Sequence, residues 1–305
     1  MSAGRISLCL SGTNMHLAYI DLNGFPYEHI QTPDGAWTAR LAVPNPDRTV
    51  FQAVRLVKGA GALLFLIGLD TAGRLCCITN DEEAGWAGNF SRLPNQTDIA
   101  FTCFDAVGAE DGGLVVVAVS ASQQCYTQST PDGVNWTQPG WSNRPTSSYS
   151  YPSDPYGISE SYEAPFPPTF STVAIRWVPP WEAGPGAPVI AGLTPGPHEN
   201  LPLVLCTDAN GNWQWDDMPW ITETTYHRGT GEPITIKSLP YKAVIRDLYF
   251  GPILLLLGTD GNLYCNTPAD GSPFDWTHPD KRGIRPEHLE LGGAAAHAVS
   301  GQKGV

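Results

Sequence analysis

The sequence predicts an all-β protein folded as a β-propeller of four-stranded antiparallel blades. Apolar strands recur along the chain, and most end at a turn that contains Asp and Gly. These residues suit tight turns because Asp bonds its own backbone and Gly tolerates positive φ. A second strand, a polar loop and a tryptophan then follow. Trp37, Trp86 and Trp136 are 49 and 50 residues apart, a period typical of propeller blades.

Each repeat begins with two apolar strands in succession. The leading strands are expected at RISLCLSG (5–12), VFQAVRLVKG (50–59), DIAFTCFDAVG (98–108), TFSTVAIRWVP (169–179) and YKAVIRDLYFG (241–251), and the second strands at 16–24, 63–73, 113–123, 202–211 and 253–261. The turn pairs are Asp21/Gly24, Asp70/Gly73, Asp208/Gly211 and Asp260/Gly261. Five starts predict five blades in one domain over 1–305, and six blades is the alternative if 142–200 contains a degenerate repeat. We expect HLELGGAAAHAVS (288–300) to close the ring beside the N-terminal strands.

The last two blade starts are more widely spaced than the first three, which places insertions at 142–168, 181–200 and 221–240. The first of these is rich in Ser, Pro and aromatic residues, including Tyr162. Long loops inside a compact fold usually serve as lids or binding loops. We therefore interpret the insertions as capping loops over one end of the ring. The alternative is that they are surface loops that cover no site.

Composition excludes several classes of function. The net charge of −13 argues against a nucleic-acid partner, whose phosphates require a basic surface. No stretch approaches the ~20 apolar residues of a membrane helix, and the N-terminal apolar run is too short for a signal peptide. The seven cysteines lie mostly in apolar strands and read as buried thiols of a reduced compartment. The sequence predicts a cytoplasmic protein that contacts no membrane, and it lacks metal-binding, Walker, GxGxxG, GxSxG and HExxH motifs, so no metal or cofactor is expected.

The strand, D-x-x-G turn, strand and aromatic recur in HLAYIDLNGFPYEH…GAWTARLAVP and LLFLIGLDTAGRLCC…AGWAGNFSRLP. This pattern resembles that of the fungal fucose-specific lectin family. The resemblance lies in the order of strands, turn and aromatic residue within each repeat, and it covers roughly two thirds of the chain. The resemblance implies a six-bladed propeller whose sugar sites use an Arg eight residues before the turn glycine and a Glu four residues after it. The first repeat has His16 and Glu28 at these positions, with Trp37 as the aromatic platform.

The other repeats depart from that pattern. The second has Phe65 and Cys77, and the fourth has Leu203 and Trp215. Apolar side chains leave sugar hydroxyls unpaired, so the resemblance implies one site at most, around Glu28. The TPDG segments before Trp37 and Trp136 also resemble the Asp-box of sialidases, a turn that marks the fold and carries no activity.

Three arginines are candidate catalytic residues. Arg55, Arg176 and Arg246 lie in the leading strands, in AVR, AIR and VIR, and are expected at matching positions along the axial channel. A buried guanidinium must be paired or meet a ligand carboxylate, phosphate or carbonyl. The alternative is a structural role, in which each pairs with a turn Asp, with carbonyls between blades or with a neighbour such as Asp247.

Residues of the insertions and of the fourth repeat complete the candidate site. Tyr226 and His227 can donate hydrogen bonds or move a proton, although a lone loop histidine is more often a solvated surface residue. The aromatic residues able to wall an apolar pocket are Trp177, Trp181, Trp213, Trp215 and Tyr162. Packing between blades is the alternative role for these tryptophans.

Two functional hypotheses follow. By analogy with lectin-like proteins of fungal natural-product pathways, the first is a cofactor-free pericyclase of the hetero-Diels–Alder type, acting on a hydrophobic terpenoid or meroterpenoid substrate. It requires only a shaped pocket and donors that polarise a carbonyl, supplied by the three arginines with Tyr226 and His227. The second is a carbohydrate-binding lectin of the fucose type with few sites, formed by Glu28, His16 and Trp37. The expected partner is a hydrophobic or glycan ligand, and a homodimer is compatible with either hypothesis.

Overall fold

The computed structural model describes most of the first 137 residues and the strands of the remainder. The described residues are 3–61, 63–81, 84–94, 99–109, 111–137, 142–143, 148–152, 159–163, 169–178, 186–194, 201–207, 213–216, 221–226, 233–238, 245–250, 254–258, 263–266 and 283–284. All their regular elements are β-strands, and within these ranges no helix could cross a membrane.

Five antiparallel sheets form the body of the molecule, each built on four consecutive strands, and the second has a fifth strand as well. The first contains β1 (Ile6–Ser11), β2 (Asn14–Ile20), β3 (Pro26–Gln31) and β4 (Leu41–Ala42). The second contains β5 (Phe51–Lys58), β6 (Leu63–Asp70), β7 (Leu75–Asp81) and β8 (Gly85–Trp86), with β9 (Ser91–Arg92) also paired to β7. The third contains β10 (Phe101–Gly108), β11 (Leu114–Ser120), β12 (Cys125–Thr130) and β13 (Ser142–Asn143). The fourth contains β16 (Thr172–Val178), β17 (Ala187–Thr194), β18 (Leu201–Thr207) and β19 (Trp213–Asp216), and the fifth contains β22 (Ile245–Phe250), β23 (Leu254–Gly258), β24 (Leu263–Asn266) and β25 (Gly283–Ile284).

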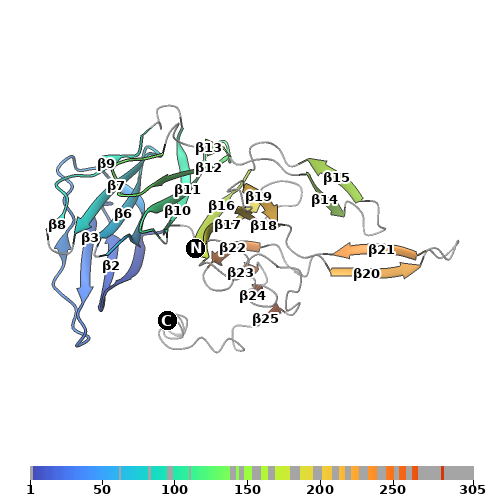
Figure 1. Cartoon of the computed structure of the whole chain (residues 1–305), viewed down its shortest axis with the longest axis horizontal. Helices are drawn as coiled ribbons and strands as arrows, with labels where there is room; N and C mark the ends of the chain where they lie inside the picture. The colour runs from blue at the N-terminus through green and yellow to red at the C-terminus, as the bar shows by residue number, and fades with distance from the viewer. Residues whose placement is uncertain are drawn as a thin grey trace.

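The described strands of the five sheets follow one another along an arc, and those of the fifth sheet do not reach those of the first (Figure 1). The predicted all-β class and the four-stranded antiparallel unit are confirmed. The blade count stays a prediction because the described strands do not close a ring, and the expected closing segment, 288–300, lies outside the described residues.

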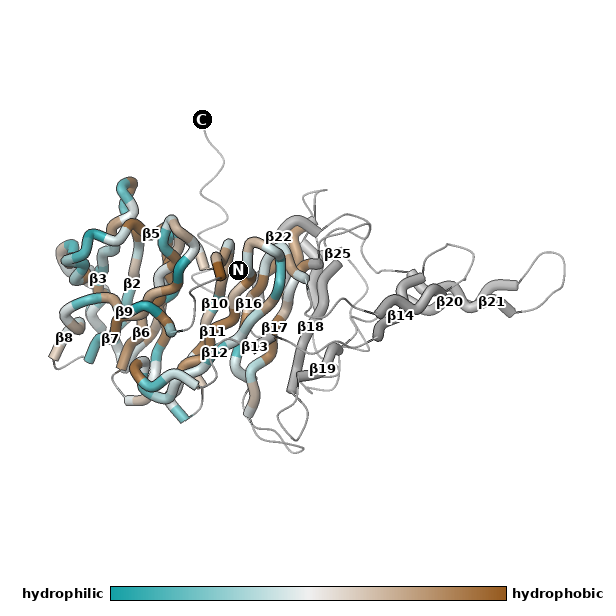
Figure 2. The backbone as a smooth tube through the Cα atoms, turned by 90° about the horizontal axis from the view of Figure 1, so that it is seen from above, coloured by the Kyte–Doolittle hydropathy of each residue, from teal (hydrophilic) through white to brown (hydrophobic). Residues whose placement is uncertain are grey.

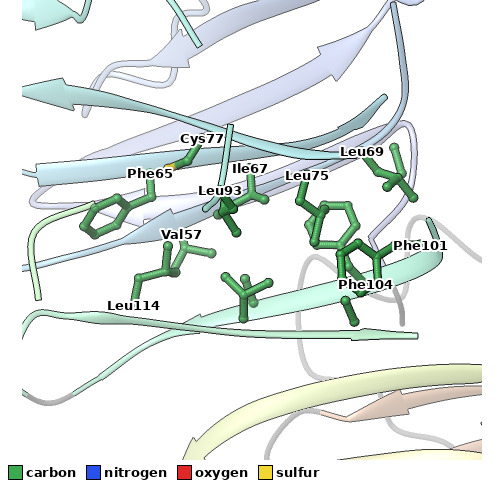
Figure 3. Packing of buried hydrophobic residues seen from close by; sticks show 14 residues of the cluster. Val57, Phe65, Ile67, Leu69, Leu75, Cys77, Leu93, Phe101, Phe104 and Leu114 are labelled. Atoms are coloured by element: carbon green, nitrogen blue, oxygen red, sulfur yellow. The ribbon is translucent and has the colours of Figure 1, made fainter. Parts of the chain in front are cut away.

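Hydrophobic clusters fill the spaces between consecutive sheets. Figure 3 shows the cluster in which Phe65, Ile67 and Leu75 of the second sheet meet Phe104 and Leu114 of the third. Similar clusters join the first sheet to the second and the third to the fourth. Because β6 is covered on both faces, nearly all of its residues are buried and its sequence is continuously apolar. Seen from above, the apolar strands β10, β11, β16 and β17 lie side by side (Figure 2).

The predicted Asp turns form as expected in the first two sheets. The Asp70 carboxylate accepts hydrogen bonds from the backbone of Ala72 and Arg74 at 2.8 Å, and Gly73 takes a positive φ of 77°. In the third sheet Gln123 occupies the glycine position, with a φ of 65°. The 208–211 and 260–261 turns lie outside the described residues.

A backbone hydrogen bond joins the start of the second, third and fourth leading strands to the turn of the preceding sheet. The amides of Phe51, Phe101 and Phe170 donate to the carbonyls of Gly24, Gly73 and Gln123, at 2.9, 2.8 and 2.7 Å. These bonds and the strand pairings align the five sheets residue by residue. Positions matched in this way are called equivalent below.

The fourth sheet corrects the prediction for 181–200. Residues 187–194 form β17, which pairs with both β16 and β18, so this part of the expected capping loop is the second strand of the sheet. The segment 202–211, expected as the second strand, instead supplies the third strand, β18. The error arose because the APVIAGLT strand lacks an Asp–Gly turn and is surrounded by Gly and Pro.

The other two insertions contain hairpins. Within 142–168, β14 (Ser148–Pro152) pairs with β15 (Ser159–Glu163), and within 221–240, β20 (Ile221–Tyr226) pairs with β21 (Pro233–Ser238). Strands β14 and β21 contact each other. Figure 1 shows β20 and β21 pointing away from the first three sheets. Their role as a cap stays a prediction.

A glycine–phenylalanine contact recurs in the second and fourth sheets and gives a test of the packing. A Cβ at Gly68 would lie 2.5 Å from the Phe51 ring, and one at Gly192 equally close to the Phe170 ring. We expect Gly68→Ala to lower the free energy of unfolding by about 1–3 kcal/mol through overpacking, measured by urea denaturation. Gly88→Ala is the control, because its Cβ would meet nothing within 4 Å. Equal stability of the two variants would contradict the close packing of the Phe51 ring on Gly68.

Candidate functional site

A charged cluster is buried between the first and second sheets. The Glu28 carboxylate lies 2.7 Å from Nδ1 of His16 through Oε1, and its Oε2 accepts a hydrogen bond from the Trp86 indole at 2.8 Å. Glu28 and His16 are 1% and 2% exposed, whereas Trp86 is partly exposed. The cluster therefore combines two residues of the first sheet with an aromatic residue of its neighbour.

Three buried polar atoms on the facing sides of these sheets have no hydrogen-bond partner among the described residues: Oγ of Ser11, at the end of β1, and two atoms closer to Glu28. The latter two are Nε2 of His16 and Oδ1 of Asn80. Asn80 lies opposite Trp86 in the β7–β8 pair, so its side chain is on the sheet face that carries the indole. Buried polar atoms are rarely left unpaired, since each costs its desolvation energy. A ligand with hydroxyl groups, which both donate and accept, would satisfy these atoms.

The strand pattern explains why this cluster forms only in the first sheet. His16 and Glu28 lie on the face that meets the second sheet, as does Ala18, the residue opposite Glu28. The positions equivalent to Glu28 in the next three sheets are occupied by Cys77, Thr127 and Val204. Those equivalent to His16 are Phe65, Val115 and Val189. In the fourth sheet, Val204 and Val189 occupy the positions at which the sequence predicted Trp215 and Leu203. The prediction was wrong because the additional strand β17 shifts the alignment.

Trp86, rather than Trp37, is the aromatic residue bonded to Glu28. Trp37 is 45% exposed and forms a bridge with Gln31 at the end of its own sheet. The sequence marks Trp86 as the repeat tryptophan of the second blade. Its role is missed when each repeat is considered alone, because the cluster spans two repeats.

A second polar cluster joins the second, third and fourth sheets. The Arg55 guanidinium lies 2.9 Å from the Asp105 carboxylate, and that carboxylate also accepts a hydrogen bond from the backbone amide of Ile175 at 3.1 Å. Burial raises the pKa of Asp105, and the charge of Arg55 partly offsets this rise. For Arg55, this geometry matches the structural alternative.

The three arginines do not occupy equivalent positions, contrary to the expectation from their sequence motifs. Arg55 pairs across the ladder with Ile67, whereas Arg176 pairs with Val189, two positions further along its strand. Arg246 falls at the irregularity near the start of β22. The residues equivalent to Arg55 are Ser7, Asp105, Ala174 and Tyr249.

The remaining predicted residues are only partly described. Arg176 is half-buried, and burial lowers its pKa. Trp177 follows it on β16, with a buried Nε1 that has no partner among the described residues. The side chains of Arg246, Tyr162, Trp213, Trp215 and Tyr226 and all of Trp181 and His227 lie outside the described residues. A pocket walled by these residues stays a prediction.

Two hollows mark the surface of the first two sheets. One, of about 520 Å³, is lined by Phe25, Pro26, Tyr27, Ala42, Val43, Pro44, Asn45, Pro46, Arg48 and Gly88. The other, of about 580 Å³, is lined by Asp47, Thr49, Val50, Asp70, Thr71, Arg74, Cys76, Phe90 and Arg92. Neither is lined by Glu28, His16 or Arg55. In the described part of the chain, no three His, Cys, Asp or Glu side chains gather to hold a metal ion.

Comparison with known proteins gives a fold but no family. No protein-family model and no curated sequence matches the chain. Among solved structures, AofleA from Arthrobotrys oligospora is similar, with a TM-score of 0.52 and 13% identity over 88% of this chain and 68% of that one. The BP39L lectin from Burkholderia pseudomallei has a TM-score of 0.51 and 15% identity, over 92% and 71% of the two chains. The chain therefore has a lectin-like β-propeller fold.

The Arg55–Asp105 pair predicts a pH-dependent stability defect. The folded-state pKa of Asp105 is raised, so its contribution to stability is full below the ordinary pKa and is lost as the pH rises through the raised value. Removing the guanidinium should enlarge that loss. We expect Arg55→Met to lower stability at pH 7 by about 2–3 kcal/mol, and by much less near pH 4, measured by thermal unfolding.

The double variant Arg55→Met/Asp105→Asn serves as the control for this pair. It removes the buried charge together with its partner and should recover most of the loss at pH 7. An Arg55→Met defect that is independent of pH would exclude Asp105 as its cause.

Proposed function

We propose that the protein is a carbohydrate-binding lectin of the fucose type with a single site at Glu28. One observation carries the proposal: a buried carboxylate held by His16 and Trp86 from two adjacent sheets, beside buried polar atoms that lack partners. The lectin-like fold supports it. Sugar recognition commonly combines charged acceptors for hydroxyls with an aromatic face for the ring.

Each group has a distinct role in this proposal. Glu28 accepts hydrogen bonds from sugar hydroxyls, and Nε2 of His16 provides a further hydrogen-bonding atom whose role depends on the tautomer. The Trp86 ring packs against the apolar face of the sugar. Because Glu28 is almost fully covered, binding requires the partly exposed indole to release Oε2 and turn toward the ligand.

The stoichiometry follows from the equivalent positions. Cys77, Thr127 and Val204 replace the carboxylate in the next three sheets. None provides a charged acceptor, so sugar hydroxyls placed there would lose the hydrogen bonds they make in water. We therefore expect one site per chain.

The pericyclase hypothesis has weaker support than carbohydrate binding. Arg55, one of its carbonyl-polarising donors, is engaged by Asp105, and the three arginines lie at different registers. The fold comparison also favours a sugar ligand. Carbohydrate binding is the function that the described geometry supports best.

Calorimetry with methyl α-L-fucoside, guided by a glycan-array screen, tests this function. We expect binding with one site per chain and a loss of at least about tenfold, or about 1.4 kcal/mol, in Glu28→Gln. This substitution keeps the side-chain volume and removes the charge. Thr127→Val, at the equivalent position in the third sheet, is the matched control and should bind normally. Absence of binding to every glycan on the array would overturn the proposal.

The two tryptophans provide a separate test of the site's location. Trp86→Phe removes the donor to Glu28 but keeps an aromatic ring, and we expect it to weaken fucoside binding several-fold. Trp37→Phe, in the exposed turn, should leave the affinity unchanged. The reverse pattern in the calorimetric titrations would move the platform to Trp37.

A further inference from the structure

The face of the first sheet that points away from the second sheet is apolar, and no described segment of the chain covers it. On β1, Ile6, Leu8 and Leu10 are 67%, 56% and 61% exposed. They alternate with Ser7, Cys9 and Ser11, which are on the opposite face. That opposite face meets the second sheet, because the Ser7 hydroxyl accepts a hydrogen bond from the amide of Leu56. We call the uncovered side the open face.

Equivalent positions in the other sheets are all buried. The residues that match Ile6 are Val54, Phe104, Val173 and Leu248, each at most 2% exposed. Those that match Leu8 are Leu56, Ala106 and Ile175, at 3%, 1% and 1%. They are buried because a preceding sheet covers them. The open face therefore has the composition of a sheet–sheet interface, but the described strands supply no sheet to cover it.

The open face extends across the sheet and carries no charge at its centre. Met15, Leu17 and Tyr19 lie opposite the three exposed residues of β1. The Tyr19 ring stacks on His29 with centroids 5.6 Å apart. Strands β1 and β2 contain no Asp, Glu, Lys or Arg. In a chain with a net charge of −13, such a face allows two copies to approach with the least repulsion.

At the other end of the arc, the fifth sheet has an outward face on which one apolar side chain is described. In the fifth sheet, Leu254 and Leu256 are buried in the direction of the fourth sheet, as their equivalents are in the earlier sheets. Leu257 points to the opposite face and is partly exposed. This second face is the kind that covers a following sheet elsewhere in the molecule. Strand contacts join each sheet to the next, and no comparable contact joins the described strands of the fifth sheet to those of the first.

We propose that the open face of the first sheet binds a second copy of this chain, which covers it with the outward face of its fifth sheet. Two different surfaces meet in this contact, so the association is head-to-tail and yields dimers or larger assemblies. The open face is on the side of the sheet opposite Glu28, so the proposal does not depend on the sugar site.

Mass measurement across concentration tests the proposal. Wild-type protein, followed by light scattering and sedimentation from about 1 to about 100 µM, should move from the 32.8 kDa monomer to dimers or larger species. Leu8→Lys should weaken the association at least about tenfold. Leu22→Lys is the matched control, because Leu22 is 97% exposed in a turn of the same sheet, outside the open face. A photo-crosslinker at Leu10 should give covalent dimers in the otherwise wild-type chain.

Two results would overturn the proposal. One is a wild type that stays monomeric throughout, and the other is a Leu8→Lys variant with the same mass distribution as the wild type. If the wild type is monomeric, and Leu8→Lys lowers Tm by several degrees whereas Leu22→Lys does not, the open face is covered by residues of its own chain. The second copy would then be excluded.

Discussion

Side-chain contacts at one position of the leading strand join the first four sheets of this protein. Ser7 of the first sheet accepts a hydrogen bond from the amide of Leu56 in the second, and Asp105 of the third accepts one from Ile175 in the fourth. Between them, Arg55 of the second sheet reaches Asp105. A leading strand has backbone groups that its own sheet leaves unpaired, and these contacts satisfy them. Together with the backbone bonds of Phe51, Phe101 and Phe170, these contacts hold the first four sheets in register with one another.

The two buried polar clusters differ in how completely they are satisfied. At Asp105 the carboxylate has a cation and a backbone donor, as expected of a structural pair. At Glu28 both carboxylate oxygens are bonded, yet His16 and Asn80 each keep an unpartnered atom in a buried space. A folded protein retains such atoms where a ligand or ordered water completes them. This difference separates the candidate site from the structural one.

The sequence was most informative where its repeats are regular. Strand order and the turns at Asp21 and Asp70 could be predicted from spacing, and so could the equivalence of Phe65 and Cys77 to His16 and Glu28. Prediction failed where a repeat lost its turn residues, as in β17. It also failed where three short motifs with a common arginine were assumed to share a register. Strand register is set by backbone pairing and irregularities, which a three-residue motif does not encode. Trp86 was missed because its contact crosses from one repeat to the next.

The first sheet carries both the sugar site and the open face, one on each side of the same strands. His16 and Leu17 are neighbours on β2 and point to opposite sides. A ligand that repositions His16 moves the backbone that also holds Leu17. If both proposals hold, thermodynamic linkage makes the effect reciprocal: the factor by which sugar changes self-association equals the factor by which self-association changes sugar affinity. The strands of the first sheet would then couple sugar binding on one face to self-association on the other.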